Sequence, residues 1–570
     1  MTATRLRRCL QTFAKKRLNF QIFRSSESTR LWKIAYFGVA AFLFVWAAHK
    51  RFSLPQYPLA DSDVGFLWPA LMKLSGGAFK HIQGLNFLYP GMVYLALRIW
   101  ADFRAISVIQ HLLGLIAGVL FLASWSRLAD FFPKPRLNRV GHEAIGLVGA
   151  SIYLLSYGSV SFEMRIRSDA VCMFFQMLVL WFVVEFFYRR VVFVNLRMST
   201  LYGIGVAISS FVLASLKPSF TLVALFVVAP VIWLTLTAKK NFSSKLAFFS
   251  VSVPIILALT LTEHFLRRDD QSVKYFLPET LFAIHAKIIH AQMDDDLNKG
   301  DTNIYPREWL QIVCDDLGTQ IQRTHGALPV LGFDPDSLMS TGADPLLNRW
   351  RSQLGDDQFL RFLKYWYWRS VAHRPLAFAG KIARQLGVFY STDCPAFSVH
   401  KKFRLTPWSY DYSLSALSHP QTWALLTVVP GGSEFVERTK ALRSSDIVIR
   451  QKRSIQMCNI FCARSYVAIL LVSVPLAVWF VLKRNNSEQR KLPAFFVLLF
   501  YTANFGNVFG VSIVHTMEVD RYVAVLFITA LFAHLWAIRW LVELGLAKRA
   551  SLMPADTLYY NPTSEHREDS

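Results

Sequence analysis

The sequence contains ten apolar runs that are long enough, or nearly long enough, to cross a lipid bilayer as helices. A spanning helix needs about 20 apolar residues, because every backbone N–H and C=O inside the hydrocarbon core must bond within its own segment. The runs cover residues 31–48, 105–125, 145–157, 170–188, 201–216, 220–237, 248–265, 466–482, 495–514 and 522–541. We therefore expect an all-α polytopic membrane protein with about ten transmembrane helices.

The composition agrees with a membrane protein and excludes several other classes. Hydrophobic residues make up 53% of the 570 residues and charged residues only 18%, whereas about a quarter of the residues in soluble domains are charged. This balance excludes a soluble enzyme, a disordered chain and a disulfide scaffold. We attribute the formal net charge of +24 to basic cytoplasmic loops, so we expect membrane lipids and no nucleic acid as partners.

The basic residues that flank the apolar runs predict the topology. Residues 1–30 carry eight Lys or Arg residues against one acid, which is typical of a cytoplasmic terminus before a signal anchor. Ten crossings then place both termini in the cytoplasm. The expected organisation is a basic N-terminus (1–30), a seven-helix transmembrane module (31–265) with a first outer loop (49–104), a long outer loop region (266–464), a three-helix transmembrane module (465–541) and a cytoplasmic tail (542–570).

The first outer loop contains two carboxylates and two short apolar stretches. Asp61 and Asp63 follow the first run closely. In a helix they would point about 200° apart, so one can face a cleft while the other caps the helix. Their alternative role is that of ordinary caps or solvated acids. Apolar residues at helical spacing over 66–74 predict a helix that lies in the membrane interface.

The other short outer segments are rich in charge. The second ends in Glu163, Arg165, Arg167 and Asp169, which fits either interfacial side chains or a phosphate site with acids for a metal or for sugar hydroxyls. Lys217-Pro218 forms a turn between two apolar runs.

The last outer segment places an arginine at a membrane edge. Arg521 follows Glu518 and Asp520 there. A lipid phosphate would satisfy this arginine, and so would an ion pair with one of these acids.

The long outer loop region predicts helices but contains no known catalytic motif. A helix break is expected at His373-Arg374-Pro375. Cys314 and Cys394 can pair if this region faces an oxidising compartment, although free cysteines are the default. There is no P-loop, GxGxxG strand motif, GxSxG elbow or HExxH motif.

These short motifs, in this order, resemble the polytopic GT-C glycosyltransferases, in particular the bacterial branch related to protein O-mannosyltransferases and lipid A aminoarabinose transferase. The motifs are Asp61-Ser62-Asp63, Tyr89-Pro90, Arg167-Ser168-Asp169, Lys217-Pro218, His373-Arg374-Pro375 and Asp520-Arg521-Tyr522. The chain departs from this pattern before Tyr89, where Asn86-Phe87-Leu88 stands in place of a stretch that often carries an Arg.

The resemblance implies a GT-C-like membrane glycosyltransferase in a bacterial inner membrane. It would transfer a sugar from a polyprenyl-phosphate donor to a glycan, lipid or protein acceptor at the outer face, as a step of cell-envelope glycan biosynthesis. Asp61 or Asp63 would be the general base. The implied roles of the other residues are donor phosphate binding for Arg521, Lys217, Arg165 and Arg167, substrate or divalent metal (Mg, Mn or Ca) binding for Glu163 and Asp169, and substrate lining for Tyr89, Tyr522 and His515.

Two other functions remain open at this stage. An O-antigen polymerase or ligase would also use outer-face arginines, but it would not depend on an acid of the first outer loop. A lipid or glycan transporter should place charged residues within its spans, and such residues are scarce in the apolar runs.

Overall fold

The computed structural model describes residues 27–60, 64–80, 86–132, 135–237, 242–268, 270, 272–301, 304–339, 345–445, 447–483 and 488–552. Within these residues nine helices are long and apolar enough to span a membrane. They belong to α2 (Glu27–Phe52), α5 (Arg104–Leu128), α8 (Asp169–Phe187), α9 (Leu196–Leu216), α10 (Thr221–Leu236), α11 (Phe242–Arg267), α22 (Arg453–Leu482), α23 (Glu488–Val514) and α25 (Phe527–Leu552). The expected all-α polytopic architecture is confirmed.

Two further helices are together long and apolar enough for a tenth span, which would agree with the ten expected. α6 (Arg139–Leu155) and α7 (Tyr157–Glu163) are bent by 48° relative to each other at Ser156. The side chain of Asn459 donates to Ser156 Oγ over 2.9 Å. Gly158 packs so closely on Ser398 that a Cβ atom there would lie 2.2 Å from its Oγ. The bend therefore lets α7 approach the segment that precedes α22.

The last span begins later than its apolar run suggests. Residues 520–524 form the short helix α24 (Asp520–Ala524), and α25 starts only at Phe527. Gln176 on α8 donates to the backbone carbonyl of Val525 over 2.9 Å. This bond satisfies a carbonyl at the break between the two helices. The break lies inside the apolar run, so apolarity alone did not reveal it.

Short helical and π-helical turns connect several of the long helices. They are η1 (Val64–Phe66), η2 (Ala129–Phe131), η3 (Tyr188–Val192, a π-helix) and η4 (Pro218–Phe220). Asn138 and Asn195 cap the N-termini of α6 and α9 by accepting bonds from backbone N–H groups. Such caps satisfy donors that have no partner inside the helix.

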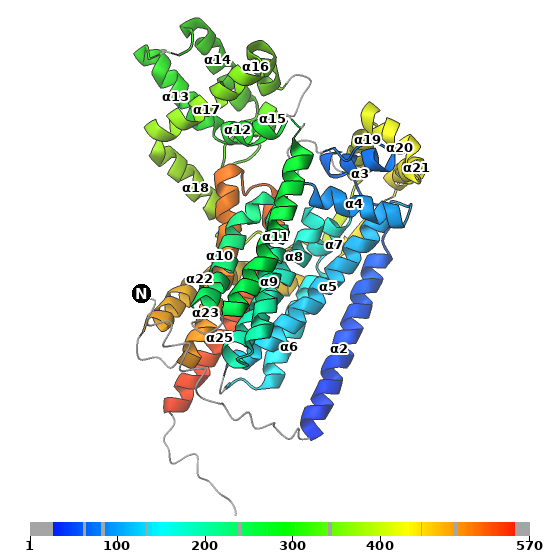
Figure 1. Cartoon of the computed structure of the whole chain (residues 1–570), viewed down its shortest axis with the longest axis vertical. Coiled ribbons are helices and arrows are strands. Elements are labelled where there is room, and N and C mark those ends of the chain that lie inside the picture. Colours follow the sequence, from blue (N-terminus) through cyan, green and yellow to red (C-terminus); the bar gives the residue numbers. More distant parts are fainter. Residues whose placement is uncertain are drawn as a thin grey trace, which may run out of the picture.

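The long region between α11 and α22 is largely helical. One part is a module with its own hydrophobic core around Trp350, Phe362 and Trp366. It consists of α12 (Ser272–Ile284), α13 (Ala286–Lys299), α14 (Arg307–Arg323), α15 (Asp336–Met339), α16 (Leu346–Leu354) and α17 (Asp356–His373). This α12–α17 module lies beyond one end of the bundle (Figure 1). Pro375 starts α18 (Pro375–Phe389), so the expected helix break is confirmed.

The rest of this region covers the first outer loop. The antiparallel strands β1 (Lys402–Leu405) and β2 (Ile447–Arg450) bracket α19 (Pro407–Leu417), α20 (Pro420–Val428) and α21 (Gly432–Arg443). These helices lie beside α3 (Trp68–Leu74) and α4 (Leu88–Ile99) of the first loop (Figure 1). Phe103 and Phe435 stack across this contact with ring centroids 4.5 Å apart.

The two cysteines of the long region are free thiols in the structure. Cys314 belongs to the core of the α12–α17 module, whereas Cys394 packs in the core of the bundle. Separate cores hold them, so they do not form the disulfide that the sequence left open.

Candidate functional site

The first and second outer loops are joined by backbone hydrogen bonds. Leu59 donates to the carbonyl of Met164 over 2.8 Å, and Ile166 donates to the carbonyl of Leu59 over 2.9 Å. Ala60 N–H donates to Ser413 Oγ over 2.9 Å. Asp61 and Asp63 lie outside the described residues. The chain is nevertheless held beside residues 164–166 at Leu59 and by Ser413 at Ala60, the residue before Asp61.

Three predicted residues meet where α8, α9 and α24 come together. Asp169 lies in the first turn of α8, and Lys217 caps η4 directly after α9. Their side chains form a buried ion pair. Lys217 Nζ also lies 4.6 Å from the centroid of the Tyr522 ring, a cation–π distance.

Two arginines complete a positive cluster around Asp169. Arg167 and Arg521 both lie close enough to Asp169 to act on its carboxylate electrostatically. Arg521 Nη2 donates to the Tyr522 hydroxyl over 2.9 Å. We call Arg167, Lys217 and Arg521 the cation cluster.

His515 lies beside the cation cluster as a neutral imidazole. Its ring centroid is 4.5 Å from that of Tyr522. Burial, assisted by Arg521, Lys381 and Lys217, lowers the pKa of His515 to about 3. His515 Nδ1 is buried.

The α12–α17 module contributes an acid to the same region. Burial, followed by the nearby Asp334, raises the pKa of Asp336 at the start of α15, and Arg521 and Arg167 oppose this shift. Asp336 therefore lies within the field of two members of the cation cluster. Sequence reasoning missed this residue, because nothing in its local pattern links it to α8 or α24.

Arg165 and Tyr89 both contact Gln110 on α5. The carbonyl of Arg165 accepts a bond from Gln110 Nε2 over 3.1 Å, and the Tyr89 hydroxyl lies 3.4 Å from Gln110 Oε1. Tyr89 is buried against Phe66 in an edge-to-face contact. Gln110 thus ties α4 and the second loop together.

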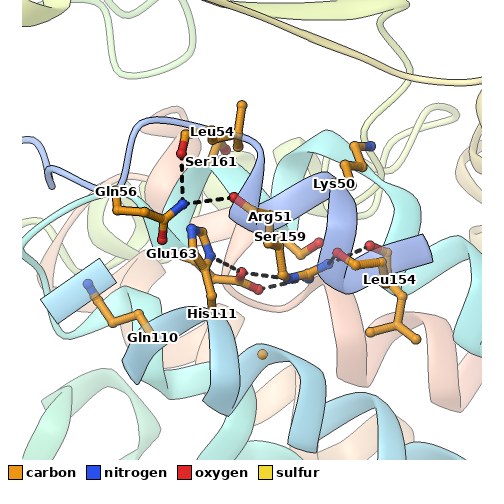
Figure 2. Close-up of polar contacts among 12 residues, drawn as sticks. Lys50, Arg51, Leu54, Gln56, Gln110, His111, Leu154, Ser159, Ser161 and Glu163 are labelled. Carbon is orange, nitrogen blue, oxygen red and sulfur yellow. Dashed lines mark hydrogen bonds and ion pairs between the residues drawn. The ribbon is translucent and has the colours of Figure 1, made fainter. Parts of the chain in front are cut away.

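Glu163 lies in a different cluster. Arg51 binds both of its carboxylate oxygens at 2.8 and 2.9 Å, and His111 Nδ1 lies 2.8 Å from Oε2 (Figure 2). Arg51 also donates to the carbonyl of Leu154 over 2.8 Å. The side chains of Arg51 and His111 are completely buried. Sequence reasoning assigned neither of them to a site, although charged or ionisable residues within apolar helices are a recognised signal.

The carboxylates predicted for a metal are already neutralised by cations. Lys217 pairs with Asp169 and Arg51 with Glu163, and a metal would have to compete with each pair. Among the described residues no group of three or more His, Cys, Asp or Glu side chains is arranged to hold a metal ion. The donor set at Glu163 and Asp169 therefore does not fit a metal.

A small, predominantly apolar cavity of about 40 Å³ lies among α8, α9, α10, α23 and α25, and none of the three cation-cluster residues lines it. Leu213 and Phe220 flank Lys217 in the sequence, Leu526 follows Arg521, and all three line the cavity. Its few polar groups include Gln176 and Thr529, which bond to each other over 3.0 Å. The remaining lining residues are Val179, Leu180, Val183, Val223, Val227, Leu499, Phe500, Ala503 and Asn504.

Comparisons of this chain with protein-family models, with curated proteins and with solved structures find no match.

Proposed function

We propose that this protein is a membrane glycosyltransferase of the GT-C type that takes its sugar from a polyprenyl-phosphate donor. The observation that supports this proposal best is the cation cluster of Arg167, Lys217 and Arg521 around the buried Asp169. An anionic headgroup carries the matching charge. The three cations exceed the two nearby acids, Asp169 and Asp336, by one positive charge, which favours a phosphate.

The cation cluster would act on the leaving group. As the bond between the sugar C1 and the phosphate oxygen breaks, negative charge develops on the phosphate. Arg521 and Lys217, already held in place by Tyr522 and Asp169, would stabilise this charge without reorganising. Because Glu163 and Asp169 do not fit a metal, no step is assigned to one.

The acceptor hydroxyl needs a base, and we assign this role to Asp61 or Asp63. In the proposed step the carboxylate takes the hydroxyl proton while the oxygen attacks C1 and polyprenyl phosphate leaves. The bonds of Leu59 with the backbone at 164–166 support this assignment, since they hold the preceding residues one strand spacing from Arg165.

The decisive experiment is a transfer assay with purified full-length protein and a polyprenyl-phosphate-linked sugar. Single Asp61→Asn and Asp63→Asn variants and an Arg521→Met variant are compared with Lys364→Met, an exposed lysine on α17. We expect one Asp variant and the Arg521 variant to lose at least about 100-fold in rate, the range of a missing base or charge stabiliser. Full activity of the Asp61→Asn/Asp63→Asn double variant contradicts the assignment of the base.

A change of donor separates this proposal from a polymerase or ligase. The proposed enzyme uses a single sugar on polyprenyl phosphate. Transfer of an oligosaccharide from a pyrophosphate carrier, with no transfer from the monophosphate, contradicts the proposal. Lipid movement across liposomes without any sugar transfer would identify a transporter instead.

A further inference from the structure

The helix α18 holds the chain segment that leads to Arg521. Lys381 on α18 is buried, and its Nζ donates to the carbonyls of Ser512 over 2.6 Å and His515 over 2.8 Å. Carbonyls at the C-terminal end of a helix such as α23 have no partner inside the helix, and they form the negative end of the helix dipole. A lysine ammonium therefore satisfies this end in both hydrogen bonding and charge.

A second residue of α18 fixes the next part of the segment. Gln385 Oε1 accepts bonds from Met517 N–H over 2.7 Å and from the Thr516 hydroxyl over 2.8 Å. Gln385 Nε2 lies 3.3 Å from Glu518 Oε2. Lys381 and Gln385 lie one helical turn apart on α18, and their side chains together hold residues 512–518.

The α12–α17 module also holds the same segment. The two carboxylate oxygens of Glu518 accept bonds from the backbone N–H groups of Val330 and Leu331 over 2.7 and 2.8 Å. α24 starts at Asp520, so Arg521 follows these anchors directly. A displacement of residues 512–518 would therefore move Arg521 away from Lys217.

We propose that Lys381 is a positioning residue of the cation cluster: it holds residues 512–518 on α18, together with Gln385, and so keeps Arg521 and Tyr522 facing Lys217. The inference rests on the proposed function, because the ligand is taken to be an anionic lipid phosphate. The contact transmits the position of α18 to a site on α24.

The charge of Lys381 also varies near neutral pH. Burial, together with Arg384 on the same helix, lowers the pKa of Lys381 to about 7. His515 and His285 face Lys381 from the neighbouring elements, and burial keeps both of them neutral by lowering their pKa values to about 3. Glu518 is held by Gln385 on the same side. Lys381 is therefore the group whose charge changes around pH 7, and the positive field near Arg521 weakens as the pH rises.

The test is a binding titration of the full-length protein in detergent, with farnesyl phosphate as the probe. The titration is repeated between pH 6 and about 8.5, a range that brackets the lowered pKa of Lys381. We expect Lys381→Met and Gln385→Leu to weaken binding about tenfold at pH 6, as when a charge-assisted or buried hydrogen bond is lost. Lys381→Arg restores binding, and the matched control Lys364→Met on α17 leaves it unchanged.

The pH dependence of binding shows whether the charge of Lys381 supports ligand binding or whether Lys381 only stabilises the fold. The ratio of wild-type to Lys381→Arg affinity cancels the titration of the phosphate itself. We expect this ratio to fall as the pH rises through about 7, because arginine keeps its charge. A flat ratio, or binding to Lys381→Met and Gln385→Leu as tight as wild type, overturns this inference alone. A wild-type protein that binds no farnesyl phosphate overturns the proposed function and this inference with it.

Discussion

Individual buried charges in this protein are each matched by an opposite charge or by backbone groups. Arg51 is the clearest example, because its guanidinium spans Glu163 and the carbonyls of Ala47 and Leu154. Gly114 makes room for the carboxylate, since a Cβ atom there would lie 2.0 Å from Glu163 Oε1. A buried ion pair contributes little net stability, but the loss of one partner leaves an uncompensated charge.

We therefore predict that Glu163→Gln strongly destabilises the protein. The variant leaves Arg51 charged and buried, which costs about 3–5 kcal/mol in such sites. The measurement is the loss of monodisperse protein after heating in detergent. The control is Glu437→Gln, which removes an exposed pair with Lys440 and should leave the curve unchanged. A Glu163→Gln variant that is as stable as wild type but inactive would instead support the predicted role of Glu163 in substrate binding.

Lys381 gives the stability a defined pH dependence. Its pKa is about 7 in the folded protein, against an ordinary value of 10.5, so the unfolded chain binds more protons between these two values. Folding stability from this group therefore increases as the pH rises from about 7 towards 10.5, and it is lost as the pH falls to 7. We predict that the melting temperature of wild type relative to Lys381→Met rises over this range. A difference that stays constant with pH contradicts the prediction.

At the scale of elements, the structure depends on contacts that bridge the ends of helices. Between α24 and α25, Gln176 donates a hydrogen bond to the backbone carbonyl of Val525. The segment before α24 is held by α18 and by the α12–α17 module. None of these contacts follows from apolar periodicity. They explain why the short helix α24, with Arg521, is placed at the end of α8 and α9.

We predict that Glu518→Gln loosens the contact between the α12–α17 module and α24. A Gln side chain has only one oxygen that can accept, so one of the N–H groups of Val330 and Leu331 loses its partner. Amide hydrogen exchange at these two residues should become faster, while exchange in the core of the module around Trp366 should not change. Unchanged exchange at Val330 and Leu331 would show that the carboxylate does not hold the module.

At the scale of the whole molecule, the two ends of the bundle differ in what covers them. The α12–α17 module and helices α3, α4 and α19–α21 all lie at one end (Figure 1). The cation cluster lies at this same end, where α8, α9 and α24 meet. All of the segments expected at the outer face therefore gather on one side of the bundle.

We predict that this side faces away from the cytoplasm. A cysteine introduced at the exposed Ser352 on α16 should react with a membrane-impermeant maleimide in intact cells. A cysteine at the exposed Ser243, near the start of α11, should react only after permeabilisation. The opposite labelling pattern would place the cation cluster in the cytoplasm, where the proposed reaction at the outer face is impossible.

The sequence predicted those site residues that border an apolar run, and it missed those whose role depends on contacts with distant parts of the chain. Arg167, Asp169, Lys217 and Arg521 were identified because each interrupts or borders an apolar run, and the structure brings them together. Asp336 and Lys381 were missed, because each lies within an amphipathic, extramembrane stretch where a charged residue is ordinary. The placement of Asp61 and Asp63 stays a prediction, since both lie outside the described residues.

Apolar runs and proline positions were enough to predict the all-α membrane architecture, the approximate positions of the spans and the helix break at Pro375. These features follow from local rules: hydrocarbon excludes unbonded backbone, and proline cannot continue a helix. Three other features became visible only in the folded chain: Glu163 pairs with Arg51 rather than joining Asp169, α6 and α7 bend, and α18 anchors the segment before Arg521. Such contacts join residues that are far apart along the chain, so no local pattern encodes them.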